Sequence, residues 1–96
     1  MEKEQIVEVV CTVVGISYEQ FYSRIRKPKF VSARAISSAI MRKHLHIKLK
    51  DIGKALGGYD HTSVIHLLRT MDDRIETEQA EREWWYESLT RLNIKG

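Results

Sequence analysis

The sequence has little of what marks several large classes of protein. A single cysteine, Cys11, excludes an internal disulfide, and one proline among 96 residues argues against a disordered or low-complexity chain. No apolar run is long enough to span a membrane, and residues 1–4 carry charges of both signs, unlike a signal peptide. The 43% of hydrophobic residues can form one modest core. We therefore expect one small cytoplasmic domain over residues 1–96.

The sequence also lacks the groupings that catalysis and cofactor binding require. No Gly-x-x-x-x-Gly-Lys-[Ser/Thr] phosphate loop occurs, and His44 and His46 form a lone His-x-His pair without nearby cysteines or a spaced acid. His66 follows Thr62 by one helical turn, but no third group or oxyanion donor accompanies them. Cys11 lies in an apolar run and is expected to be buried. The sequence predicts neither an enzyme nor a metal or cofactor site.

Charge is distributed unevenly along the chain. Residues 24–54 hold ten basic side chains and one acid, whereas residues 72–87 hold seven acids and two arginines. Such asymmetry orients a protein towards a polyanion, although many charge runs are only solvated surface. Because the basic run is one-signed and adjoins the turn described below, it favours nucleic-acid binding.

The spacing of apolar residues predicts an all-α fold of five to six helices. A first helix is expected over residues 2–14, and Ser17 can cap a short second one before a basic loop over residues 24–29. Ser32 can cap a third helix over residues 33–46, and residues 49–56 follow as a short fourth.

A double glycine then separates the fourth helix from the fifth. Glycine accepts positive φ and ends helices, and Asp60 can cap the next helix. Thr62 can offer its methyl group to thymine, His61 can donate to a base, and Asp60 can accept from a cytosine amino group, while Ser63 suits a phosphate. A second interpretation makes Asp60 only a cap and His61 only a surface histidine. The first predicts a helix-turn-helix that reads the major groove.

A last helix is expected over residues 78–92, capped by Thr77 and added to a core domain of residues 5–76. One of Trp84 and Trp85 should seal the core, and the other should be partly exposed.

From about residue 6 to residue 71 the sequence resembles the C-terminal DNA-binding domain of the bacterial replication initiator DnaA, which is related to the Trp-repressor type of helix-turn-helix. The resemblance rests on the Arg-x-Arg loop, the Ser-Ala-Arg entry to the third helix, Asp51-Ile52-Gly53, and the run Leu56-Gly-Gly-Tyr-Asp-His-Thr-Ser-Val-Ile-His66. That run departs from the family's signature at Tyr59, where arginine is usual, and at Ser63.

The resemblance implies that Asp60, His61 and Thr62 read bases of a short asymmetric box in the major groove and that Arg26 enters the minor groove. Lys50 replaces a proline of some members, which would trade base discrimination for phosphate affinity. The residues expected at the DNA backbone are Arg24, Lys27, Lys29, Arg34, Arg42, Lys50, Ser63 and His66, with Arg34 and Arg42 on the outer side of their helix.

Without a nucleotide site the chain is not expected to open an origin by itself. It is either an excised domain or a small stand-alone bacterial or phage protein, associated with the nucleoid, that binds double-stranded DNA and regulates replication initiation or transcription. A monomer suffices for an asymmetric site, whereas a dimer would suit a palindrome. The alternative is a module that binds the initiator or another replication protein through Trp84 and Trp85.

Overall fold

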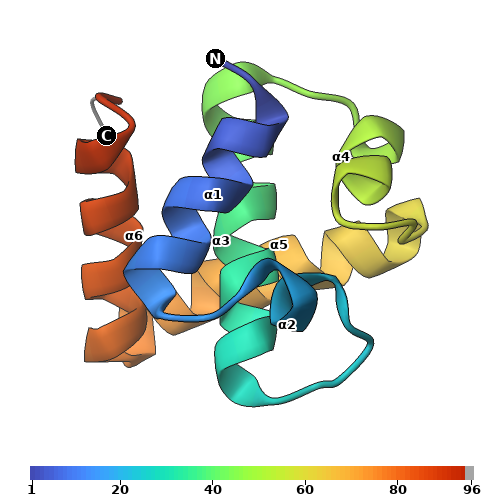
Figure 1. Ribbon diagram of the computed structural model, residues 1–96. Helices are drawn as coiled ribbons and strands as arrows, with labels where there is room; N and C mark the ends of the chain where they lie inside the picture. Colours follow the sequence, from blue (N-terminus) through green and yellow to red (C-terminus); the bar gives the residue numbers. More distant parts are fainter. Residues whose placement is uncertain (95–96) are drawn as a thin grey trace.

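The computed structural model describes residues 1–94, which fold into a bundle of six helices (Figure 1). In chain order they are α1 (Lys3–Val14), α2 (Tyr18–Tyr22), α3 (Pro28–Leu45), α4 (Leu49–Ala55), α5 (His61–Thr77) and α6 (Gln79–Arg91). The predicted all-α class is confirmed. Among the described residues, no helix is both long enough and apolar enough to cross a membrane.

Helix α3 runs through the middle of the molecule and contacts all five other helices of the described part of the chain. In Figure 1 it stands behind α1, with α5 crossing it. Most of its central residues are alanine and serine, and the whole stretch from Ser32 to Met41 is buried, because these small side chains let neighbouring helices approach from every side. The expectation that Arg34 lies on an outer side is therefore wrong, whereas Arg42 is exposed as predicted.

Helix α3 begins at Pro28 rather than after a Ser32 cap, so the predicted start was wrong. Proline suits the first helical position, where no N–H partner is needed and φ is already helical. The Ser32 side chain is instead used in tertiary contacts: its hydroxyl donates to the Glu81 carboxylate of α6 and accepts from Arg74 Nη1 at 2.6 Å.

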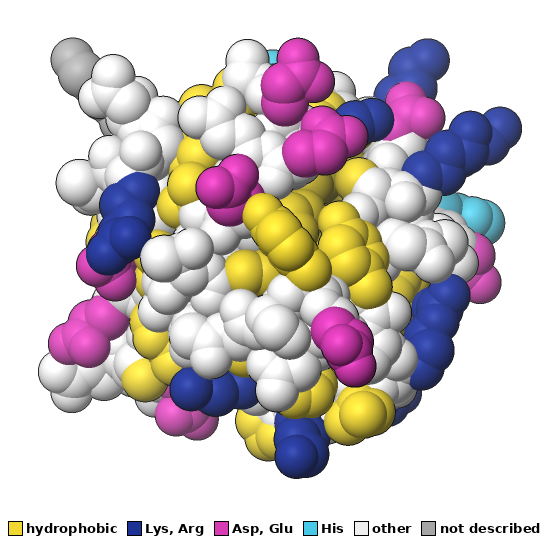
Figure 2. Space-filling model, in the orientation of Figure 1, with side chains coloured by type: hydrophobic (Ala, Val, Ile, Leu, Met, Phe, Trp, Pro, Cys, Tyr) yellow, Lys and Arg dark blue, Asp and Glu magenta, His cyan; other side chains and the backbone are white. Residues whose placement is uncertain are grey.

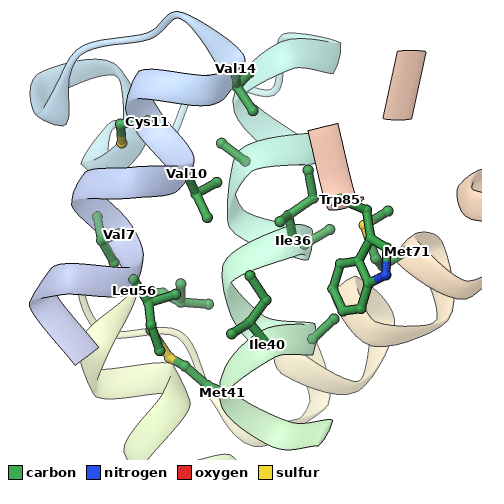
Figure 3. Close-up of a cluster of buried hydrophobic side chains, with 14 of the residues drawn as sticks. Val7, Val10, Cys11, Val14, Ile36, Ile40, Met41, Leu56, Met71 and Trp85 are labelled. Atoms are coloured by element: carbon green, nitrogen blue, oxygen red, sulfur yellow. The ribbon is translucent and has the colours of Figure 1, made fainter. Parts of the chain in front are cut away.

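The core fills the space between α1, α3, α5 and α6 (Figure 3). Side chains from these helices meet there, among them Val7, Val10, Val14, Ile36, Ile40, Met71 and Trp85. Cys11 is buried at the same surface of α1, as predicted, and burial raises the pKa of its thiol to about 11. The thiol is therefore neutral and unreactive at physiological pH.

Helix α6 packs against α1 and α5, and its cap residue differs from the prediction. Thr77 is not the cap, because its hydroxyl donates to the Asp73 carbonyl within α5 at 3.0 Å, and Glu78 occupies the cap position. Trp85 is buried and Trp84 is half-buried, so the expected division between the two tryptophans is confirmed.

Candidate nucleic-acid interface

The turn between α4 and α5 is tight and fixed by its backbone. Gly57 and Gly58 both have φ of 100°, a conformation that suits glycine. The N–H groups of Gly58 and Tyr59 both donate to the Gly53 carbonyl at 3.0 Å. A Cβ on Gly53 would lie 2.0 Å from the Tyr59 carbonyl oxygen, so α4 approaches the turn backbone to backbone. The predicted double-glycine turn is therefore present, and Gly53 makes its close approach possible.

Asp60 caps α5, as predicted: its Oδ1 accepts the Ser63 N–H at 2.8 Å. This backbone hydrogen bond is the main cause that lowers the pKa of Asp60, so the carboxylate is charged at neutral pH. His61 and Thr62 follow in the first turn of α5, and both are exposed. The cap thus uses one carboxylate oxygen and presents the next two side chains to solvent.

We expect Asp60 to make stability depend on pH. Its pKa is lowered by folding, so its contribution is fully present above the ordinary value of 3.8 and is lost as pH falls through the lower folded-state value. Asparagine keeps the cap without the titration. Thermal melts at pH 7 and pH 3 should therefore show a larger loss of stability for the wild type than for Asp60→Asn, and an equal loss would contradict the capping role of the charge.

The basic loop between α2 and α3 is fixed by hydrogen bonds from Arg34, whose side chain is only 3% exposed. Its Nε, Nη1 and Nη2 donate to backbone carbonyl oxygens at the end of α2 and in the loop: those of Gln20, Phe21, Ser23 and Ile25. The prediction of Arg34 as a DNA-backbone contact assumed a free surface side chain. The structure corrects that assumption, because most of the Arg34 donors are bound within the protein.

A pocket of about 340 Å³ lies between the basic loop and α5. Its lining consists of Arg24, Arg26, Val31, Arg34, Tyr59, Ser63, His66, Leu67 and Thr70, and it includes no acid. Burial lowers the pKa of Arg34, and the nearby charges of Arg24 and Arg26 lower it further. Three arginines thus line the pocket with no acid among the described residues of its lining, which makes the pocket attractive to an anion.

The fold brings five predicted contact residues, Arg24, Arg26, Arg34, Ser63 and His66, to this one pocket, but it leaves others outside it. Lys29 lies towards the end of α1, with its Nζ 3.7 Å from where a Cβ on Gly15 would be. Three further predicted backbone contacts outside the pocket, Lys27, Arg42 and Lys50, are exposed. In Figure 2 lysine and arginine side chains follow the right-hand edge of the molecule, where Figure 1 shows α4 and the start of α5.

The pocket also includes residues outside the predicted set of DNA contacts. Thr70 lies four residues after His66 and seven after Ser63, so helical spacing could have placed it on the same face. Tyr59 is half-buried, and its ring lies under the Arg24 guanidinium, with Cζ 4.3 Å from the ring centroid. No local sequence pattern indicates the contact between Arg24 and Tyr59, because the two residues are far apart along the chain.

The profile of the bacterial dnaA protein helix-turn-helix family matches residues 3–71, from α1 into α5. The chain belongs to this family. It is 37% identical to the chromosomal replication initiator protein DnaA of Gloeobacter violaceus over 93% of this chain and 19% of the relative. It is 35% identical to DnaA of Ureaplasma parvum serovar 3 over 81% of this chain and 17% of the relative.

The chain thus spans about a fifth of the length of the curated relatives that it matches. A third relative, DnaA of Synechocystis sp., is 32% identical over 97% of this chain and 21% of its own length. Membership in the DnaA helix-turn-helix family implies binding to double-stranded DNA. In this chain α4, the double-glycine turn and α5 form the helix-turn-helix.

Proposed function

We propose that the chain binds a short asymmetric site in double-stranded DNA as a monomer, and that it does so without catalysis. In this proposal His61 and Thr62 read base edges in the major groove, the free oxygen of Asp60 accepts from a base, and Arg26 enters the adjacent minor groove. Bound to boxes of the DnaA type, the chain would regulate replication initiation or transcription.

The observation that carries this proposal is the shared pocket. Arg26 from the basic loop lines it together with Ser63 and His66 from α5. His61 and Thr62 are exposed on the same first turn of α5 as Ser63. The proposed minor-groove residue, Arg26, thus lines the same pocket as Ser63 and His66 of the helix that carries the proposed major-groove readers. This supports contact with two neighbouring grooves and the phosphate backbone between them.

We expect Arg26→Ala and His61→Ala each to weaken binding to a DnaA-type box by about 1–3 kcal/mol, because each removes a base contact. Fluorescence anisotropy at fixed salt measures the affinity. Arg91→Ala is the matched control, since Arg91 is exposed on α6 and pairs only with Glu87 in the described structure. The proposal is wrong if both variants bind the box as the wild type does.

The preferred site can be obtained by selecting bound duplexes from a random pool at fixed salt. An asymmetric box of the DnaA type supports the proposed role. A palindrome would indicate a dimer instead of a monomer. Selection without any motif would leave only the electrostatic component of binding, which falls steeply as salt rises.

The alternative function, protein binding through Trp84 and Trp85, has weaker support from the geometry. Trp85 is buried in the core, with Lys43 Nζ 5.8 Å from its ring centroid, so it is not available to a partner. Of the other two aromatic residues of α6, Trp84 is half-buried and Tyr86 is exposed, and two residues apart they point to nearly opposite sides of the helix. Trp84→Ala should therefore leave DNA affinity near the wild-type value, and a loss as large as that of His61→Ala would show that α6 contributes to DNA binding as much as the turn does.

A further inference from the structure

Arg24 connects the basic loop to the helix-turn-helix across the interface. Its Nη2 donates to the Gly57 carbonyl at 3.2 Å and lies 3.5 Å from the Gly58 carbonyl oxygen. Its guanidinium lies over the Tyr59 ring, with Cζ 4.3 Å from the ring centroid. Arg24 thus touches three consecutive residues of the turn, through two different kinds of interaction.

The two segments that Arg24 joins, the turn at Tyr59 and the basic loop, are each held in place by other contacts. Tyr59 is half-buried against the core, and its N–H donates to the Gly53 carbonyl at 3.0 Å. On the loop side, Arg34 binds the carbonyl groups on either side of Arg24, those of Ser23 and Ile25. Arg24 therefore connects two segments that are each held by hydrogen bonds of their own.

From this geometry we infer that Arg24 and Tyr59 form a clamp that sets the distance between the basic loop and the start of α5. Both are positioning residues for the proposed DNA binding, on which this inference rests. By fixing the loop before DNA arrives, the clamp removes an ordering cost that binding would otherwise include. Arg26, two residues after Arg24, is thereby held beside Ser63 and His66 on the wall of the pocket.

The clamp also explains why arginine and tyrosine are needed as a pair. A planar guanidinium can stack on a ring and donate to carbonyl groups at its edge, whereas the lysine ammonium is a point charge without a face. A DNA phosphate, by contrast, accepts lysine well. Replacing Arg24 by lysine therefore separates a positioning role from a phosphate contact, because the charge is kept and only the clamp is lost.

The test begins without DNA, with trypsin cleavage after Arg26 followed by mass spectrometry. Arg26 and Lys27 are exposed, but trypsin needs a segment that can move into its active site, and opening of the clamp frees the loop to do so. Arg24→Lys and Tyr59→Leu should therefore each be cleaved about two- to fivefold faster than the wild type. Leucine keeps the apolar bulk that Tyr59 places against the core. Tyr59→Phe keeps the ring and should match the wild type, and so should Tyr86→Leu, which changes an exposed tyrosine of α6. Circular dichroism melts verify that every variant is folded.

DNA affinity then supplies the second part of the test. Arg24→Lys and Tyr59→Leu should each weaken DNA binding about two- to fivefold. The double variant should bind with the affinity of the weaker-binding single variant, because the two changes break the same contact. If both single variants were cleaved at the wild-type rate, the clamp would be overturned. Additive losses of affinity, or wild-type affinity of Arg24→Lys, would equally overturn it in favour of separate DNA contacts. If the wild type binds no DNA, the proposed function fails, whereas the cleavage result still decides whether the clamp exists.

Discussion

Replacement of Gly53 by alanine is expected to destabilise the protein by about 3 kcal/mol or more, the upper range for forcing an extra carbon into a packed site. The added Cβ would lie 2.0 Å from the Tyr59 carbonyl oxygen and 3.0 Å from its carbonyl carbon. Both atoms belong to the backbone of a turn whose N–H groups are bound to Gly53 itself, so neither side can move away easily. In a domain of this size the melting temperature should fall by more than about 10 °C.

Gly15→Ala is the control for this prediction. Gly15 has φ of 85°, so alanine there meets the cost of the left-handed conformation, roughly 1 kcal/mol, but its Cβ has only Lys29 Nζ nearby, at 3.7 Å. Thermal unfolding followed by circular dichroism compares the two variants. If Gly53→Ala melted at the same temperature as Gly15→Ala, the turn would have to be looser than its hydrogen bonds indicate.

Substitution of Arg34 by methionine is expected to cost about 3 kcal/mol, because it leaves several partly buried carbonyl groups without their donor. The affected groups belong to the end of α2 and to the basic loop, so the loop should also become mobile and DNA affinity should fall. Urea unfolding measures the stability. Arg42→Met is the matched control: Arg42 is an exposed arginine of the same helix, bound to one carbonyl group, that of Ile47 at 3.1 Å, and its loss should cost about 1 kcal/mol or less.

The Arg34→Met and Arg42→Met variants also distinguish the two roles considered for Arg34, a structural one and a phosphate contact. A residue that only contacts phosphate would leave stability unchanged and would reduce the slope of log affinity against log salt by about one when removed. If Arg34→Met were as stable as the wild type and showed that reduced slope, the structural role inferred from its burial would be wrong.

The features that the sequence predicted well depend on near neighbours in the chain. The turn needs only that Gly57 and Gly58 tolerate positive φ, and the cap needs only the Asp60 carboxylate three residues before the Ser63 N–H. The exposure of His61 and Thr62 follows from the same local geometry. Residue identity at short range was therefore sufficient to locate the exposed part of α5.

Two of the errors, at Ser32 and Arg34, fall where distant segments compete for the same side chain. Ser32 has the chemistry of a helix cap, but Arg74 and Glu81 from other helices take its hydroxyl, and Pro28 begins the helix instead. Helical periodicity predicts an outer position for Arg34 because it assumes one buried and one solvated side. That assumption fails for α3, which is surrounded by other helices.

By itself, then, the sequence determined the helical class, the double-glycine turn, the cap of α5, the basic loop and the family resemblance, because each is encoded within a few neighbouring residues. Only the tertiary structure decided how the loop sits on the turn. That arrangement depends on two contacts. Arg34 donates to carbonyl groups of α2 and of the loop, and the Arg24 guanidinium lies over the Tyr59 ring. These contacts join segments far apart in the chain, and they form only after the helices have packed around α3.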